Sequence, residues 1–183
     1  MKYKDAVKNA MEMLAEDERT VFIGYNIKRG SRAYGTLASI PGEKCIEMPV
    51  AENLMGGLAT GMALEGYRPV VFFERQDFML NASDNIVNHL SKLEEMSGGQ
   101  FCAPVIIRAI IGSRKPIDCG IQHSQDFTEI FKSIIKFPLY RPKNSREVKE
   151  AYLAAKNSKV PVMVVEERSL YDQEDCSIIG DTQ

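Results

Sequence analysis

Four short runs of the chain are apolar from end to end, and this pattern constrains the fold more than any other feature. They occupy residues 21–23, 70–73, 105–107 and 161–165. A strand with one face in water alternates apolar and polar side chains, whereas a strand covered on both faces is apolar throughout. Because segments with helical spacing separate these runs, the sequence predicts a mainly parallel sheet covered by helices on both faces. Shorter strands are expected within residues 45–48 and 137–142.

Helices are predicted where apolar residues recur every three or four positions. They are expected over residues 3–15, 51–65, 78–96, 127–134 and 145–158, the last with Ser145 as its N-cap. The fold class is therefore α/β, with one three-layer domain over residues 1–170. Residues 171–183 are polar, and we expect them to form a C-terminal tail.

Charge and hydropathy argue against two classes of partner. The net charge is −2, with acidic and basic residues interspersed, whereas a nucleic-acid-binding face needs a clustered basic excess. No apolar stretch approaches the roughly 20 residues that span a bilayer. The first residues also lack the apolar core of a signal peptide. We therefore expect a cytoplasmic protein that binds neither nucleic acid nor membrane.

The cysteines and histidines match no zinc motif in their spacing. Disulfides are rare in cytoplasmic proteins, so we expect free thiols, most of them buried, and no metal ligands. The cysteines are Cys45, Cys102, Cys119 and Cys176.

An acidic residue stands at the entrance to an unusual helix. Glu52 follows a turn at Pro49, and the helix after it contains Gly56, Gly57 and Gly61. Each glycine lowers helix stability by up to about 1 kcal/mol relative to alanine. Close approach of another backbone is the usual compensation. A first-turn glutamate also interacts favourably with the helix dipole, and spacing alone does not separate that role from a functional one.

Several sequence segments together carry a resemblance to a known family. They read DER and VFIG at residues 17–24, PVAE at 49–52, GYRPVV at 66–71, DNIVNH at 84–89, MSGG at 96–99, QHSQ at 122–125 and PV at 161–162. With them, residues 11–171 resemble the N-terminal half of the β subunit of 2-oxo-acid dehydrogenase E1 components, in the transketolase-like superfamily. The match covers nearly the whole chain in register. It implies the pyrimidine type of the thiamine-diphosphate-binding fold.

The resemblance implies roles for five residues. In the family this domain binds the aminopyrimidine ring of thiamine diphosphate, and the residue matching Glu52 shares a proton with that ring, which activates the cofactor. His123 matches a histidine on the substrate side that assists proton or acyl transfer. Phe78 matches an aromatic position beside the ring, although a core position at a helix start is as consistent with its sequence. Glu74 and Gln76 lie in the same stretch and are expected cofactor contacts.

The chain also departs from the family pattern near the expected site. Tyr25 stands where the family usually has an acidic residue, and Phe72 stands where it commonly has a glutamate. Glu74 and Arg75 replace apolar or small residues. These two residues either make the pocket polar enough for a hydroxylated or charged substrate, or form an ordinary exposed pair after a strand. The departures bear on the substrate and not on the cofactor.

Two elements of the family are not found in this sequence. No Gly-Asp-Gly segment followed by an asparagine tract is present, so diphosphate and Mg²⁺ are expected to bind mainly to a separate subunit, with the active site between the two chains. The further C-terminal domain of the β subunits is also not found. This favours a free-standing decarboxylase or carboligase at least as much as a dehydrogenase complex. The expected activity is decarboxylation and/or C–C bond transfer on a 2-oxo acid or ketose.

Two other functional classes stay open from the sequence. A catalytically silent structural or regulatory subunit would keep the fold, although it would have no reason to keep a buried acid at Glu52. An unrelated nucleotide-binding module would need a phosphate-binding glycine loop, which the sequence does not contain.

The glycine-rich helix predicts how the chain assembles. From Ala51 to Glu65 small residues form a row that would let two backbones approach closely. We expect this helix to pack against its own copy about a two-fold axis. Two such chains with two partner chains would form a heterotetramer.

Overall fold

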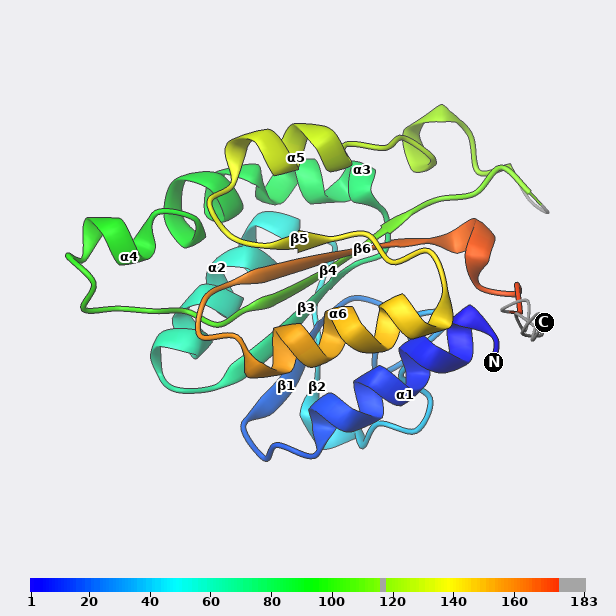
Figure 1. Cartoon of the computed structure of the whole chain (residues 1–183), viewed down its shortest axis with the longest axis horizontal. Coiled ribbons are helices and arrows are strands. Elements are labelled where there is room, and N and C mark those ends of the chain that lie inside the picture. The colour runs from blue at the N-terminus through cyan, green and yellow to red at the C-terminus, as the bar shows by residue number, and fades with distance from the viewer. Residues whose placement is uncertain (116–117, 175–183) are drawn as a thin grey trace, which may run out of the picture.

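Six parallel strands form one sheet in the computed structural model, which describes residues 1–115 and 118–174 (Figure 1). Their order across the sheet is β2-β1-β3-β4-β6-β5, and every pair of neighbours is parallel. The sheet confirms the α/β class predicted from the apolar runs. The strands are β1 (Thr20–Gly24), β2 (Cys45–Glu47), β3 (Arg68–Phe73), β4 (Ile106–Ile111), β5 (Leu139–Tyr140) and β6 (Val162–Glu167).

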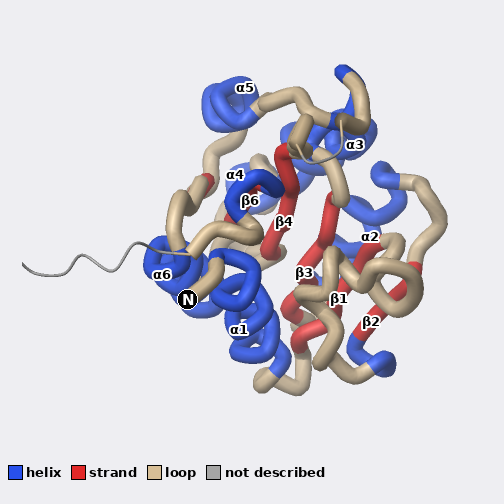
Figure 2. Tube along the Cα trace, turned by 90° about the vertical axis from the view of Figure 1, so that its right-hand side faces the viewer, coloured by secondary structure: helices blue, strands red, loops and turns tan. Residues whose placement is uncertain are grey.

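Helices cover both faces of the sheet and complete three layers (Figure 2). Helices α1 and α6 pack against each other on one face, while α2, α3 and α5 lie on the other. Each face has its own apolar core, because each central strand sends alternate side chains to opposite sides. The helices are α1 (Tyr3–Ala15), α2 (Glu52–Leu64), α3 (Gln76–Met79), α4 (Leu93–Met96), α5 (Thr128–Ile134) and α6 (Ser145–Asn157).

The helix expected over residues 78–96 is present in part: the chain is helical over residues 76–90 and 93–96, but its hydrogen bonding is irregular and a turn separates the two stretches. The segment contains α3, a 3₁₀ turn Leu80–Ala82, a π-helix Asn85–Leu90 and α4. The Ser83 hydroxyl donates to the Leu80 carbonyl at 2.7 Å and so competes with regular helical bonding. Ser91 N–H then bonds to the Ile86 carbonyl at 3.0 Å, which is the spacing of a π-turn. Leu80 is exposed as a result, while Ile86 and Leu90 remain in the core.

The C-terminal part of the core extends past the expected boundary at residue 170. Tyr171 is fully buried, and its carbonyl accepts a hydrogen bond from Lys4 N–H at 3.1 Å. Lys2 and Glu174 form an antiparallel bridge, so the two ends of the described chain meet. The domain therefore includes at least residues 1–174; of the tail expected over residues 171–183, the part from residue 175 lies outside the described residues.

Two local expectations are also corrected. Asn144, not Ser145, caps α6: its side chain accepts from Glu147 N–H at 2.9 Å and donates to Glu147 Oε1 at 2.6 Å. Of the cysteines in the described residues only Cys45 is buried, whereas Cys102 and Cys119 are exposed. The fourth cysteine lies outside the described residues.

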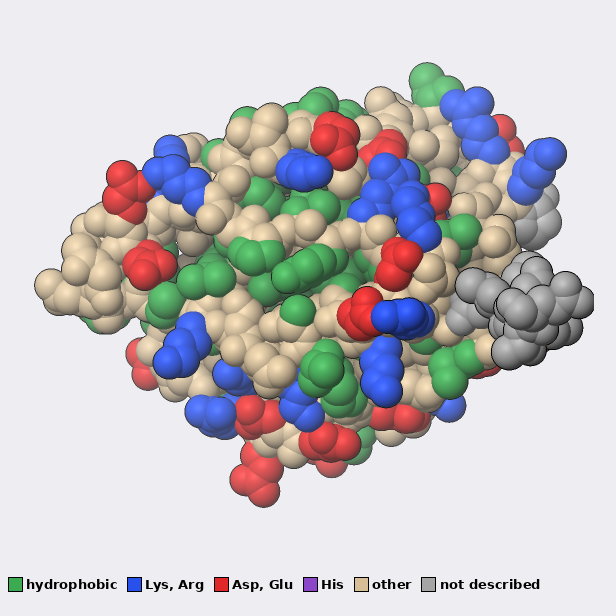
Figure 3. Space-filling model, in the orientation of Figure 1, with side chains coloured by type: hydrophobic (Ala, Val, Ile, Leu, Met, Phe, Trp, Pro, Cys, Tyr) green, Lys and Arg blue, Asp and Glu red, His purple; other side chains and the backbone are tan. Residues whose placement is uncertain are grey.

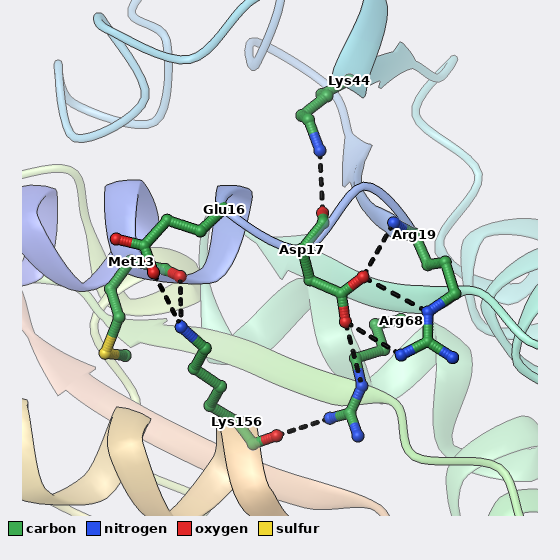
Figure 4. A network of polar contacts seen from close by, with 7 residues as sticks. All are labelled: Met13, Glu16, Asp17, Arg19, Lys44, Arg68 and Lys156. Carbon is green, nitrogen blue, oxygen red and sulfur yellow. Dashed lines mark hydrogen bonds and ion pairs between the residues drawn. The ribbon is translucent and has the colours of Figure 1, made fainter.

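A network of polar contacts ties the helices to the sheet at the amino ends of β1 and β3 (Figure 4). Asp17, in the turn before β1, accepts two side-chain hydrogen bonds from Arg19 and lies 3.6 Å from Arg68 Nε. The hydrogen bonds from Arg19 hold the pKa of Asp17 below its ordinary value of 3.8. Arg68 also donates to the Lys156 carbonyl at 2.6 Å, and Lys156 reaches Glu16 at 3.0 Å. The turn before β1 is thereby fixed to β3, and Arg68 and Lys156 join these elements to the C-terminal end of α6.

The face of the molecule seen in Figure 3 carries mixed charges and an apolar band. Figure 3 shows this band between α5 and α6, over β5. The exposed apolar side chains of these elements are Ile130, Ile134, Tyr140 and Leu153. In the part of the chain that the structure describes, no helix is both long and apolar enough to cross a membrane.

The centre of the sheet holds a buried ion pair. Arg108 on β4 donates to both carboxylate oxygens of Glu166 on β6, at 2.6 and 3.0 Å, and both side chains are 1% exposed or less. Thr36, Tyr152 and Tyr171 supply hydroxyl groups to the same pair. Burial disfavours the charged guanidinium, but the Glu166 carboxylate outweighs this effect and raises the pKa of Arg108.

Glu166→Gln should lower the free energy of unfolding by about 3–5 kcal/mol, because it leaves the Arg108 charge buried without a carboxylate. Chemical denaturation of the purified chain measures the change. Glu150→Gln is the matched control: Glu150 pairs with Arg146 at the surface, where the side chains are 59% and 86% exposed. That loss should stay below about 1 kcal/mol. Equal losses in the two variants would contradict the importance of the buried pair.

Candidate functional site

The candidate site lies where the carboxyl ends of β1 and β3 meet. The strand after β1 in the chain, β2, lies on one side of β1, and the next strand, β3, lies on its other side. The direction in which the sheet is built therefore reverses between β1 and β3. In open α/β sheets such a reversal leaves a crevice at the carboxyl edge, where ligands bind. Tyr25 follows β1 directly, Glu74 and Arg75 follow β3, and Glu52 begins the helix after β2. The topology therefore gathers these residues at one edge.

Glu52 is buried at this edge, although it is the first residue of α2. Glu52 is only 4% exposed. A glutamate whose sole role is to interact with the helix dipole can stay in solvent. The Tyr25 hydroxyl donates to Glu52 Oε1 at 3.2 Å. Asn81 Nδ2 reaches Oε2 at only 3.5 Å, the limit of a hydrogen bond. One carboxylate oxygen is thus held, and the other keeps most of its capacity to accept or share a proton.

Tyr25 is a site residue that sequence reasoning missed. It was noted only as a departure from the family pattern, yet its hydroxyl is the nearest donor to Glu52 among the described residues. Burial, followed by the Glu52 carboxylate, raises the pKa of Tyr25 above its ordinary value of 10. The hydroxyl therefore stays protonated and remains a donor. An aromatic hydroxyl directly after a strand that ends at the site was the signal available in the sequence.

Phe78 on α3 and His123 in the loop after β4 meet edge to face. Their ring centroids are 5.2 Å apart at an interplanar angle of 86°. Phe78 is half-buried and packs against the apolar core, and its place beside a cofactor ring stays a prediction. His123 Nδ1 is buried and finds no hydrogen-bond partner among the described residues. These contacts bring the two predicted residues together, and their roles toward a cofactor remain predictions.

Gln76 is placed differently from a free cofactor contact. It is fully buried, and its side chain donates to Thr128 Oγ1 at 3.3 Å and accepts from Phe127 N–H at 2.5 Å. Both ends of its amide are therefore engaged by the chain itself. The contacts show Gln76 fastening the start of α5 to α3, and any contact with a cofactor stays a prediction.

Glu74 and Arg75 are half-buried, not an ordinary exposed pair. Glu74 Oε2 accepts from Asn26 Nδ2 at 3.2 Å, which joins β3 to the loop after β1. Tyr34 of that loop lies under Arg75, whose Cζ is 5.3 Å from the ring centroid. The two residues that depart most in polarity from the family pattern thus line the same edge as Glu52.

Unpaired polar atoms concentrate at this edge. Three buried side-chain atoms have no hydrogen-bond partner within the described residues: Arg75 Nε, Asp77 Oδ2 and His123 Nδ1. Buried polar atoms are usually paired, because leaving one unpaired costs free energy. Their clustering around one edge indicates a surface that a ligand or partner completes. Over the described ranges no group of His, Cys, Asp and Glu could hold a metal ion.

These residues fit an aminopyrimidine ring in their chemistry. Glu52 keeps one weakly engaged carboxylate oxygen in a buried position, which suits a hydrogen bond to a ring nitrogen. Phe78 offers part of an aromatic surface beside it. The neutral Tyr25 hydroxyl orients the carboxylate without adding a second charge.

Fold and site together define the class of this protein: an α/β domain with a candidate small-molecule site at the switch point of a parallel sheet. Comparison with known proteins then identifies its family. The model of the transketolase pyrimidine-binding domain matches residues 1–173, and the chain belongs to this family.

Curated relatives and solved structures agree with this assignment. The chain is 31% identical over 173 residues to the pyruvate dehydrogenase E1 component subunit beta of Rickettsia conorii, covering 92% of this chain and 52% of the relative. It is 30% identical to the mitochondrial counterpart of Saccharomyces cerevisiae, covering 94% and 48%. The chain spans about half the length of these relatives.

Two solved structures share the fold. A split gene transketolase, described as an inactive beta4 tetramer, aligns with a TM-score of 0.66 at 18% identity, over 92% of this chain and 52% of that chain. The thiamine diphosphate-dependent 4-hydroxybenzoylformate decarboxylase of Rhodococcus jostii RHA1 aligns with a TM-score of 0.67 at 17% identity, over 95% and 31%. Both confirm the predicted fold class.

Gly112→Ala should displace the segment that carries His123. A Cβ at position 112 would overlap the His123 carbonyl oxygen and lie 3.1 Å from Arg75 Cδ, so the neighbouring backbone must move. The imidazole resonances of His123 in NMR spectra report this movement. Gly42→Ala is the control, since its Cβ would meet only Lys28 Cε at 3.4 Å. Unchanged His123 resonances in Gly112→Ala would contradict the close packing of this edge.

Proposed function

We propose that this chain is the pyrimidine-domain subunit of a two-chain thiamine-diphosphate enzyme. The enzyme acts on a 2-oxo acid or ketose, by decarboxylation and/or C–C bond transfer. The observation that carries the proposal is the buried Glu52 carboxylate, oriented by Tyr25 at the switch point of a pyrimidine-binding domain. The alternative is a catalytically silent structural or regulatory subunit that keeps the fold.

In this proposal Glu52 holds and shares a proton with a ring nitrogen of the bound cofactor. Thiamine diphosphate supplies the carbon centre that attacks the substrate carbonyl and accepts its electrons. Tyr25 keeps Glu52 Oε1 in place, which leaves Oε2 for the proton. Burial excludes water from this carboxylate and strengthens its interaction with the ring. The family resemblance and the aromatic contact with Phe78 support the position of His123 on the substrate side, where its imidazole can exchange protons.

A partner chain completes the proposed site. Mg²⁺ and the diphosphate group would bind mainly to that chain, since this sequence contains no diphosphate-binding motif. Relatives named as beta subunits and a structure named as a split gene transketolase support a division of the enzyme between two chains.

The exposed face of α2 supports self-association. Gly57 and Gly61 are exposed, and a Cβ at Gly61 would meet no atom of this chain within 4 Å. Gly56 differs, because a Cβ there would lie 2.9 Å from Asn85 Cβ of the π-helix, so its close approach is internal. Leu54 and Leu64 on the same helix are 56% and 45% exposed. We infer that this face packs on a second copy, giving a heterotetramer with two partner chains.

Glu52→Gln should abolish turnover of the enzyme reconstituted with its diphosphate-binding chain, while fold and assembly survive. An amide cannot share the proton, so kcat should fall by at least about 10²-fold. Steady-state kinetics measure the loss, and circular dichroism and light scattering check fold and mass. Glu43→Gln, an exposed acid outside the site, serves as the control. Near-normal turnover of Glu52→Gln would refute the role, and wild-type enzyme without turnover would favour the silent subunit.

Gly61→Leu should separate the assembly without weakening the fold. Leucine is a better helix former than glycine by somewhat less than about 1 kcal/mol, and the position is open within the chain. Thermal unfolding should therefore show an intact domain, while light scattering should show loss of the native mass and kinetics loss of activity. Gly61→Ala is the smaller control. If Gly61→Leu keeps the native mass, the interface lies elsewhere.

A further inference from the structure

Arg75 carries a positive charge that the described residues do not neutralise. Its Nη1 donates to the Glu74 backbone carbonyl at 2.7 Å, and its Nη2 reaches only Cys119 Sγ at 4.0 Å. Its Nε is buried without a partner. Arg75 takes part in none of the ion pairs found among the described residues, and the Glu74 carboxylate accepts from Asn26. The Nε–Nη2 edge, which is the edge that binds a carboxylate in bidentate fashion, therefore faces no oxygen acceptor.

The packing of Arg75 places it beside the predicted catalytic groups. Arg75 Cδ and the His123 carbonyl both pack against Gly112, at the end of β4. The Tyr34 ring supports the guanidinium from the loop after β1. Arg75 also lowers the pKa of Tyr25, though less than burial and Glu52 raise it, so its charge is felt at the hydroxyl that holds Glu52. The side chain thus lies between the Glu52 side of the site and the His123 side.

The charges around Arg75 favour one kind of anion. Glu52, Glu74 and Asp77 lie on the same edge of the sheet, so an anion at Arg75 is attracted by one cation and repelled by nearby acids. A singly charged carboxylate meets less repulsion from these acids than a phosphate dianion does, and one cation is enough to balance its charge. A neutral hydroxylated ligand would leave the guanidinium without a counter-ion.

We propose that Arg75 is a specificity-determining residue that binds the carboxylate of a small 2-oxo acid through its Nε–Nη2 edge, next to His123. This inference deepens the proposed function and rests on it for the reaction, but the anion site itself can be tested without turnover. Of the two kinds of substrate that the polar residues of this edge allow, hydroxylated and charged, the inference favours the charged one.

The test is a titration of the full chain, labelled with ¹⁵N, with sodium pyruvate. The Nε–Hε resonance of Arg75 in NMR spectra is the readout. Loss of one peak in Arg75→Lys assigns that resonance. Pyruvamide, which has the same shape without the charge, and inorganic phosphate are titrated in parallel at constant ionic strength. We expect a saturable shift with pyruvate in the millimolar range typical of one charged contact, and little shift with pyruvamide. A second readout is pyruvate binding measured on the backbone amides of residues 120–125.

Arg75→Gln should weaken pyruvate binding at those backbone amides by about tenfold or more, because it removes a bidentate charged contact. Arg146→Gln, which removes an exposed guanidinium on α6, should change nothing. Circular dichroism checks that Arg75→Gln is folded. The proposal is overturned if the Arg75 resonance does not respond to pyruvate, if pyruvamide or phosphate binds as well, or if Arg75→Gln binds normally. A negative result in the pyruvate titration does not bear on the turnover of Glu52→Gln. Normal turnover of Glu52→Gln likewise does not bear on pyruvate binding at Arg75.

Discussion

Arg108 and Glu166 lie on adjacent strands at the centre of the sheet, where water does not reach them. A buried ion pair is stable only when its remaining hydrogen-bonding positions are also filled. Here hydroxyl groups from three other elements fill them: Thr36 in the loop after β1, Tyr152 on α6 and Tyr171 after β6. The pair therefore fixes a loop, a helix and the end of the domain to the same point of the sheet. The rest of the α1–α6 side is arranged around this requirement.

The loop held by Thr36 in turn supports the candidate site. Four of its residues are non-glycine residues with positive φ, which costs free energy unless the surroundings compensate. Glu47 at the end of β2 compensates in part, because its carboxylate accepts backbone N–H groups from Asn26 and Lys28 at 2.6 Å each. The ordered loop then presents Tyr34 beneath Arg75, while Tyr25 at its start reaches Glu52. The loop after β1 therefore connects the buried Arg108–Glu166 pair to the candidate site, because it contacts both.

The site combines one family feature with several that are its own. The chain belongs to the transketolase pyrimidine-binding domain family, and in our proposal Glu52 is the acid that activates the cofactor. Around it, Tyr25, Glu74 and Arg75 replace the usual residues with a hydroxyl and a pair of charges. Because the polar groups lie at the rim and the acid lies beneath them, we interpret the differences as adaptations toward the substrate. The buried acid and its helix would then serve the cofactor.

The sequence by itself determined the layers of this protein and the place of its acid. Uniformly apolar strands must be covered on both faces, and the family motifs predicted roles for Glu52, Phe78 and His123. Only the tertiary structure decided which side chains meet. It made the helix expected over residues 78–96 irregular, since a local hydroxyl competed with the backbone and π-spacing brought Asn85 against Gly56. It also engaged Gln76 with α5 and brought Tyr25 to Glu52. Such contacts join residues up to about 50 positions apart, and no local pattern encodes them, because they depend on strand order and on the space that neighbouring side chains leave.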